Sequence, residues 1–197
     1  MPNSVEKVGS KAFLYCLKLE TLSLSESLDT ISDFAFRQNQ RIKEVIIPNS
    51  VTHIGVGSFF NCLSLQTLTI GKNVKTLADE AFAGIRSISI LNSLAATPPQ
   101  ILGVSTSSHI NKNTCQLNVP VGSKAAYQAA DVWKDFSLIS EKEELTSIEQ
   151  LEASSTLVWP TNIYDMNGRL VRENAHSTDG LTGGVYIING RKVLIND

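Results

Sequence analysis

The sequence has few charged residues and no long apolar run. Asp, Glu, Lys and Arg make up 18% of its 197 residues, and the formal net charge is -2. This balance gives no reason to expect nucleic acid or an anionic membrane as a partner. Because no run of about eighteen apolar residues exists, we predict no membrane-spanning segment.

Histidine and cysteine are also scarce, and no group of residues with catalytic spacing is present. The histidines His53, His109 and His176 have no metal-like spacing to one another or to cysteine. Gly183-Gly184 precedes a predicted strand rather than a helix, which excludes the phosphate-binding turn of a P-loop. We therefore predict a protein that is not an enzyme, with no catalytic residue, no metal ligand and no cofactor.

The first half of the chain repeats with an unbroken 23-residue period. Four phenylalanines follow this period, each preceded by a small residue: Phe13, Phe36, Phe59 and Phe82. Aliphatic residues keep the same register, among them Val8, Ile31, Ile54 and Leu77. A constant period of this length is typical of a solenoid, whose coils bury their apolar faces by stacking. We expect the phenylalanine rings to form one continuous stack.

Each coil is predicted to contain one short strand. Leu22-Ser23-Leu24 and Leu68-Thr69-Ile70 alternate apolar and polar residues, as a half-buried strand does. Pro48 marks the end of another such segment. Stacked coils then give a parallel sheet with strands roughly 4.8 Å apart. The segment around each phenylalanine is too short for a full helix and is expected to form a single helical or 3₁₀ turn.

These residues resemble the BspA-like leucine-rich repeats, whose coil has the consensus S-V-x-x-I-G-x-x-A-F-x-x-C-x-x-L-x-x-I-x-I-P. The most faithful copy begins at Pro48 and runs through Ser50-Val51, Ile54-Gly55, Phe59 and Cys62. The resemblance covers roughly half of the chain. It implies a right-handed leucine-rich-repeat solenoid from a surface or secreted protein of host-associated bacteria, which recognises other proteins or glycans and has no catalytic residues.

The position of the cysteines in the repeat argues against disulfides. Cys16 and Cys62 occupy the same coil position two coils apart, which is roughly 10 Å and beyond the Cα limit for a disulfide. Asn39 takes this position in the coil between them, where a small polar side chain can satisfy backbone groups at a turn. Cys115 lies outside the repeat and could pair only if the last coil folds back. We expect buried thiols.

The repeat weakens towards residue 93, and a capping region is predicted at about 93–140. Pro98-Pro99 forces extended backbone, and Gln116–Pro120 is predicted to form one more strand. Lys124–Trp133 is predicted to form a short helix that Ser123 caps. Tyr127, Ala130 and Trp133 share one face of this helix and are expected to cover the end of the phenylalanine stack. Trp133 could alternatively bind a sugar, although packing is the favoured interpretation. This segment also resembles the end of BspA-like solenoids.

A second domain is predicted at 148–197, after a solenoid domain of 1–140. The charged stretch Glu141–Glu144 is interpreted as the bridge between them. Asn167-Gly168 and Asn189-Gly190 each separate two strand-like segments, which is typical of two-residue hairpin turns. With an earlier strand near Leu157-Val158-Trp159, these segments predict a small antiparallel β domain of four or five strands.

The tail resembles the C-terminal modules of secreted bacterial proteins that use an outer-membrane sorting route. Its matching residues include Ile163-Tyr164-Asp165, Gly168-Arg169 and Gly184–Ile188. The resemblance implies an immunoglobulin-like sandwich with a role in sorting. The chain opens within a repeat at Met1–Ser4, without a polar cap or a signal peptide, so we expect that it is a fragment or a mature portion from which a leader was removed.

The open side of the predicted sheet is the candidate binding surface. Its predicted residues are Thr21, Ser23, Glu44, Ile46, Thr67, Thr69 and Ser89. They are mostly hydroxyl-bearing, with Ile46 as the only large apolar member. The sequence therefore predicts a non-catalytic cell-surface or secreted adhesion protein that binds an extracellular protein or glycan. The alternatives are an ordinary solvated sheet on a structural spacer and, least favoured, an enzyme with an unforeseen pocket.

Overall fold

The computed structural model of the chain describes residues 1–142, 161–165, 169–175, 177, 179–182, 184–188 and 191–195. The chain divides into two compact units, Met1–Leu145 and Thr146–Asp197. The expected strand near Leu157-Val158-Trp159, both Asn-Gly turns and His176 lie outside the described residues, as do Glu143 and Glu144. Each unit is described by itself.

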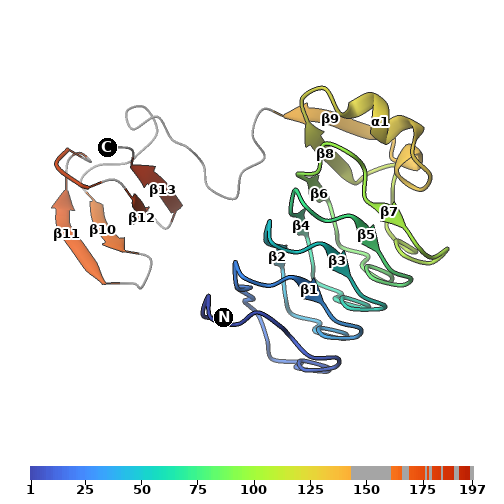
Figure 1. The fold of residues 1–197 in the computed structure, drawn as a ribbon, viewed down its shortest axis with the longest axis horizontal. Coiled ribbons are helices and arrows are strands. Elements are labelled where there is room, and N and C mark those ends of the chain that lie inside the picture. Colours follow the sequence, from blue (N-terminus) through green and yellow to red (C-terminus); the bar gives the residue numbers. More distant parts are fainter. Residues whose placement is uncertain are drawn as a thin grey trace. The chain divides into compact units, whose positions relative to one another are not determined.

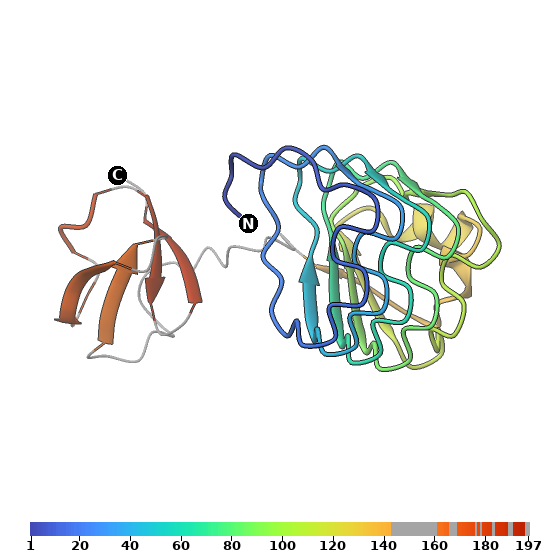
Figure 2. The same cartoon turned by 90° about the horizontal axis from the view of Figure 1, so that it is seen from below.

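The first unit is a solenoid with two parallel sheets. One sheet has the order β2-β4-β6-β8-β9 and the other has the order β1-β3-β5-β7. Figures 1 and 2 show the coils stacked along one axis, with strands of the two sheets on different sides of each coil. The strands of the larger sheet are β2 Glu44–Ile46, β4 Thr67–Ile70, β6 Ile90–Ser93, β8 Gln116–Pro120 and β9 Leu138–Lys142. Those of the smaller sheet are β1 Thr30–Ile31, β3 His53–Ile54, β5 Thr76–Leu77 and β7 Gln100–Ile101.

The solenoid and the strands of the larger sheet confirm the expected fold class, whereas the smaller sheet was not foreseen. Its strands are too short to show the alternation of a strand in the sequence. The 23-residue period sets the register of both sheets, for example Val45↔Leu68 in one and Ile31↔Ile54 in the other. The strand expected at Leu22-Ser23-Leu24 is absent. That segment belongs to the first coil, which has a neighbouring coil on one side only.

The expected phenylalanine stack is present. Ring centroids are 5.2 Å apart between Phe13 and Phe36, and 5.3 Å apart between Phe36 and Phe59. The next step, from Phe59 to Phe82, is 5.8 Å with an interplanar angle of 19°. Phe36 and Phe59 are fully buried. Since each buried aromatic side chain removes roughly 150 to 250 Å² from water, at roughly 25 cal/mol per Å², these rings are a major source of stability.

The segments around the phenylalanines are consecutive tight turns and not continuous 3₁₀ helices. The N–H groups of Phe34 and Phe36 donate to carbonyls of the next coil, whereas the intervening Ala35 donates to Ser32 three residues back. Because alternate donors leave the coil, an uninterrupted i to i-3 ladder cannot form. Left-handed backbone, with φ from 53° to 77°, recurs at two positions of each coil: Lys11, Phe34, Gly57 and Glu80, and Tyr15, Gln38, Asn61 and Gly84.

The solenoid continues for one further coil beyond Ser93, within the region that the sequence assigned to the cap, and the strand expected at Gln116–Pro120 is present there as β8. Strand β7 extends the smaller sheet and β8 extends the larger one. The period is no longer 23, because the step from Leu77 to its partner Ile101 is 24 and the step from Leu91 to its partner Leu117 is 26. This lengthening hides the coil from a search at fixed spacing. The prolines at 98 and 99 are accommodated immediately before β7.

The cap contains the expected helix, but α1 spans only Lys124–Ala129, and Trp133 lies in a separate 3₁₀ helix, η1 Trp133–Asp135. The predicted helix is interrupted because Ala130 has extended backbone and Val132 has φ of 69°. Tyr127 and Trp133 are buried and in edge-to-face contact, with ring centroids 5.3 Å apart. The indole N–H of Trp133 donates to the Pro99 carbonyl at 2.9 Å, and the Tyr127 hydroxyl donates to the Ala95 carbonyl at 2.8 Å. Ser123 is the residue before α1, but its side chain makes no capping hydrogen bond. Trp133 therefore serves packing, and its buried position excludes the sugar-binding alternative.

The charged stretch predicted as a bridge is partly sheet. Glu141 and Lys142 are the last residues of β9, and they pair with Val119 and Pro120 of β8. The Glu141 carboxylate also accepts a hydrogen bond from the N–H of Lys124 at the start of α1. The prediction was wrong here because β9 carries only one buried aliphatic residue, Ile139, and so lacks the apolar pattern of a strand.

The second unit contains the expected small antiparallel sheet. Its order is β11-β10-β12-β13. The strands are β10 Thr161–Asp165, β11 Leu170–Ala175, β12 Gly184–Ile188 and β13 Arg191–Ile195. The pairings β10 with β11 and β12 with β13 are those that the two hairpins predict. Ile163, Ala175 and Ile188 are buried together and form its small core.

Candidate binding face

The outward residues of the larger sheet form two rows that cross its strands. The pairing registers place one row at Glu44, Thr67, Ile90, Gln116 and Leu138. They place the second row at Ile46, Thr69, Asn92, Asn118 and Ser140. We call these ten residues the outer face. The residues between the rows, such as Val45, Leu68 and Leu117, point into the core and are fully buried.

Four of the seven predicted binding residues lie together on this face. Glu44 and Ile46 are exposed on β2, and Thr67 and Thr69 follow at the same positions of β4. Thr69 is 7% exposed, so the second row is more enclosed than expected.

The other three predicted residues lie outside the strands of the sheet. Thr21 and Ser23 belong to the first coil, before β2. Ser89 precedes β6, and its N–H donates to the Gln66 carbonyl at 3.0 Å, so the residue in line with Thr67 is Ile90. The assignment of Ser89 to an open strand position was wrong by one residue.

Six residues of the outer face were missed in the sequence, and two of them change its character. Ile90 is 38% exposed and Leu138 is 44% exposed, so Ile46 is not the only large apolar residue here. Asn92, Gln116, Asn118 and Ser140 complete the missed set. The period could have located Ile90 and Asn92, which lie one repeat beyond Thr67 and Thr69. The residues of β8 and β9 could not be located this way because their spacing is irregular.

A chain of side-chain hydrogen bonds links three strands within the second row. The Asn118 side chain donates from Nδ2 to Oδ1 of Asn92 at 2.8 Å. Asn92 in turn donates from Nδ2 to the hydroxyl of Thr69 at 3.1 Å. Asn118 is 2% exposed, and its own Oδ1 is buried with no hydrogen-bond donor among the described residues. These contacts fix the orientation of the amide groups of both asparagines.

The outer face is nearly neutral and offers no reactive group. Glu44 is its one charged residue, and none of the ten residues is aromatic. Within the part of the chain that the structure describes, no three His, Cys, Asp or Glu side chains gather as a metal site. No described helix is both long enough and apolar enough to cross a membrane. The chemistry available at the face is hydrogen bonding and apolar contact.

The three cysteines are free thiols, and two of them are buried in the core. Burial raises the pKa of Cys62 to about 12, although a hydrogen bond with the backbone of Asn39 acts in the opposite direction. Burial likewise raises the pKa of Cys115 to about 11. Both thiols are therefore neutral at physiological pH and poorly nucleophilic. The Cys62 thiol donates to the Phe36 carbonyl at 3.4 Å, which is a packing role.

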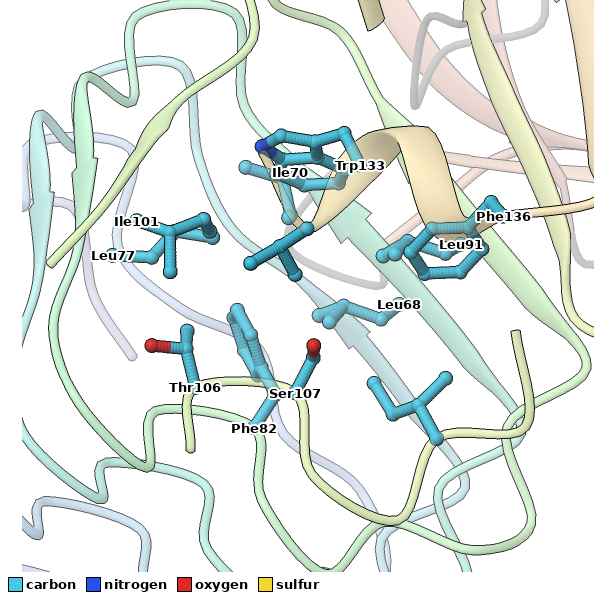
Figure 3. Close-up of a pocket in the computed structure, with 12 residues that line it drawn as sticks. Leu68, Ile70, Leu77, Phe82, Leu91, Ile101, Thr106, Ser107, Trp133 and Phe136 are labelled. Carbon is cyan, nitrogen blue, oxygen red and sulfur yellow. The ribbon is translucent and has the colours of Figure 1, made fainter. Parts of the chain in front are cut away.

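A small cavity lies where the phenylalanine stack meets the cap. Its volume is about 20 Å³, and Figure 3 shows Phe82, Ser107 and Trp133 around it. Phe59 donates from its N–H to Ala81, the residue before Phe82, and Phe82 donates in the same way to Thr106. Ser107 thus occupies the place of a fifth phenylalanine, and Trp133 and Phe136 line the space beside it. The space is too small for an organic ligand.

Comparison with known proteins agrees with this geometry. A family model described as BspA type leucine rich repeat region matches residues 1–93 in six copies. Among solved structures, the chain is similar to the crystal structure of the pneumococcal vaccine antigen PcpA, with 28% sequence identity and a TM-score of 0.50. The match covers 72% of this chain and 34% of that chain, so it spans about a third of the antigen's length. The comparison with curated proteins found no match.

Proposed function

The first 93 residues belong to the BspA-type leucine-rich-repeat family, and on this basis we propose that the chain is a non-catalytic binding protein. The outer face of its larger sheet recognises an extracellular macromolecule, either a host or matrix protein or a glycan. The observation that carries the proposal is the face itself, where five strands in register present hydrogen-bonding side chains next to exposed Ile46, Ile90 and Leu138. Its proposed ligand contacts include four of the predicted residues on this face, namely Glu44, Ile46, Thr67 and Thr69. The predicted residues Thr21, Ser23 and Ser89 lie outside the strands and are proposed as further contacts beside the face.

The dimensions of the face suit a macromolecule better than a small metabolite. Five strands at roughly 4.8 Å spacing span about 19 Å. Small-molecule sites are concave and bury most of their ligand, whereas this surface is a sheet. Exposed aliphatic residues among polar side chains, with a single charge, are compatible with a modest protein or glycan interface.

We place the protein at the cell surface or outside the cell, with a role in adhesion. The similarity to a vaccine antigen supports this location, because antibodies act on proteins that they can reach from outside the cell. The residues 148–197 act as a separate module for sorting or secretion. Limited proteolysis that releases an intact solenoid, cut just beyond Lys142, would support independent domains, whereas uniform degradation would contradict them.

The competing function is a structural spacer with no ligand of its own. The experiment that separates the two uses a glycan array and an extracellular-matrix protein array, both probed with the intact chain. The double variant Ile46→Glu with Thr67→Lys adds charge to the outer face, and Thr30→Val on the other sheet is the control. Saturable binding that the double variant loses and the control keeps supports recognition. The absence of binding on both arrays would favour the spacer.

A further inference from the structure

The amide of Asn92 is held on both its nitrogen and its oxygen by neighbouring side chains of the outer face. A carboxamide has two N–H donors and an oxygen with two acceptor sites. One donor of Asn92 bonds the Thr69 hydroxyl, and one acceptor site receives the N–H of Asn118. One donor and one acceptor site therefore remain. Because both neighbours hold the amide in place, the remaining pair is presented in a fixed direction on a side chain that is partly exposed.

Asn118 holds the Asn92 amide but buries its own side-chain oxygen without a hydrogen-bond donor among the described residues. It is 2% exposed, and no described donor reaches its buried Oδ1. A buried acceptor without a partner costs about 1 to 3 kcal/mol, so such a group calls for an explanation. An aliphatic residue would avoid this cost. The asparagine is explained if its function is to hold the Asn92 amide for a ligand.

The remaining groups of Asn92 match the main chain of a polypeptide. One N–H donor beside one carbonyl acceptor is complementary to the C=O and N–H that every extended residue exposes. Exposed Ile90 lies on the same strand, two residues before Asn92, and Ile46 lies in the same row two strands away. These aliphatic side chains can pack against the apolar side chains of such a segment. A glycan would instead favour an aromatic platform, and the outer face has none.

We propose that the ligand of this face is an extended polypeptide segment, and that Asn92 hydrogen-bonds to its main chain while Asn118 and Thr69 position the Asn92 amide. This inference rests on the proposed function and specifies its partner. It assigns direct contact to Asn92 and a positioning role to Asn118. Neither asparagine is among the binding residues that the sequence predicted.

The test is selection of binders from a phage-displayed library of random dodecapeptides, using the intact chain as bait. The best selected peptide is then resynthesised with single N-methylated residues and, separately, with single alanines. Main-chain recognition predicts that N-methylation at one residue weakens binding at least tenfold, whereas alanine at that residue weakens it less than threefold. Asn92→Leu is expected to weaken binding at least tenfold, which corresponds to about 1.4 kcal/mol. Asn118→Leu is expected to do so about fivefold.

Control variants distinguish a loss of binding from a loss of folding. They also distinguish failure of the polypeptide inference from failure of the proposed function. Thr30→Val on the other sheet keeps full affinity. Asn92→Asp keeps the size of the side chain and loses its donors, so it gives an intermediate loss even where Asn92→Leu unfolds the chain. If no peptide is selected while a glycan array gives binding that Ile46→Glu with Thr67→Lys abolishes, the proposed function stands and the polypeptide inference fails. If neither Asn92→Leu nor the double variant Ile46→Glu with Thr67→Lys changes the affinity for the selected peptides, the proposed function and the polypeptide inference are both wrong.

Discussion

Between Leu28 and Ser93 the coils keep a constant period and close their core with stacked phenylalanines, whereas the coil that follows uses other residues for the same purpose. In the regular coils, rings 5.3 Å apart fill the interior. In the last coil, Ser107 stands in the ring position, and Trp133 and Phe136 enter from the cap. The regular region depends on identical neighbours. The last coil depends on long-range contacts that end the stack and satisfy its backbone groups.

The largest effect is expected for truncation of a ring in the regular coils. Phe59→Ala removes a fully buried side chain that stacks on both neighbours, and we expect a loss of about 4 kcal/mol in the free energy of unfolding. Urea denaturation followed by circular dichroism measures it. Phe60→Ala, at a half-buried neighbouring position, is the matched control and is expected to cost less. Equal losses for the two variants would show that the stacked rings contribute no more to stability than a half-buried phenylalanine.

Truncation of a ring in the cap should lower the free energy of unfolding almost as much, but for a different reason. Trp133→Ala removes buried ring volume and also leaves the Pro99 carbonyl without its indole donor, and we expect a loss of about 3 kcal/mol. Trp133→Phe retains part of the volume and should lose less. The measurement is the shift of the urea midpoint. An unchanged midpoint for Trp133→Ala would rule out the capping role.

The polar residue Asn39 tests the contribution of hydrogen bonds, rather than apolar packing, within the regular coils. Asn39 donates from Nδ2 to the carbonyls of Phe13 and Phe36, both at 2.8 Å. Asn39→Ala removes the amide donor of the Phe13 carbonyl and leaves the Phe36 carbonyl with only the weak thiol donor of Cys62, and we expect a loss of about 2 kcal/mol. Asn39→Cys installs the residue found at Cys16 and Cys62 and should restore part of it. Thermal unfolding of the two variants measures the difference, and identical melting would contradict the proposed hydrogen-bonding role.

Alkaline pH should weaken both regions through their buried acids. Burial raises the pKa of Cys62 from 9.0 to about 12, that of Cys115 from 9.0 to about 11, and that of Tyr127 from 10.0 to about 12. The folded state thus favours the neutral forms, and their contribution is fully present below the unfolded pKa. It is lost as pH rises from about 9 towards 12, at up to about 1.4 kcal/mol per pH unit and group.

Urea titrations at pH 7, 9 and 11 test this dependence. The double variant Cys62→Ala with Cys115→Ala should show a shallower decline above pH 9, because only Tyr127 remains. A decline as steep as in the parent chain would show that the thiols do not contribute.

The smallest effect concerns the junction between the two regions. Ser107→Val adds apolar atoms beside the cavity of about 20 Å³, and we expect a gain of about 0.5 kcal/mol. Ser108→Val, one residue further and not lining the cavity, should give no gain. Differential scanning calorimetry can compare them. Destabilisation by Ser107→Val would mean that the junction is already fully packed and that the extra methyl groups strain it.

The accuracy of the sequence prediction followed the regularity of the repeat. The stack from Phe13 to Phe82 and the strands β2, β4 and β6 could be predicted because every coil repeats the same apolar spacing. In the coil after Ser93 the strand β8 could be predicted, but its register with β6 could not, since the spacing lengthens there. Strand β9 could not be predicted because it has one buried aliphatic residue. The same irregularity concealed Asn118 and Leu138, and an error of one residue placed Ser89 where Ile90 lies.

By itself, the sequence determined that the first half of this protein is a solenoid, because apolar residues at a fixed 23-residue spacing are all buried when coils stack. The capping helix and the small antiparallel sheet could be predicted from local patterns, namely a helical segment and two Asn-Gly turns between strand-like segments. Only the tertiary structure decided which side chains share the outer face and how Asn92 and Asn118 hydrogen-bond. These contacts depend on the pairing register of β8 with its neighbours β6 and β9. Spacing along the chain does not encode that register once the repeat loses its fixed length.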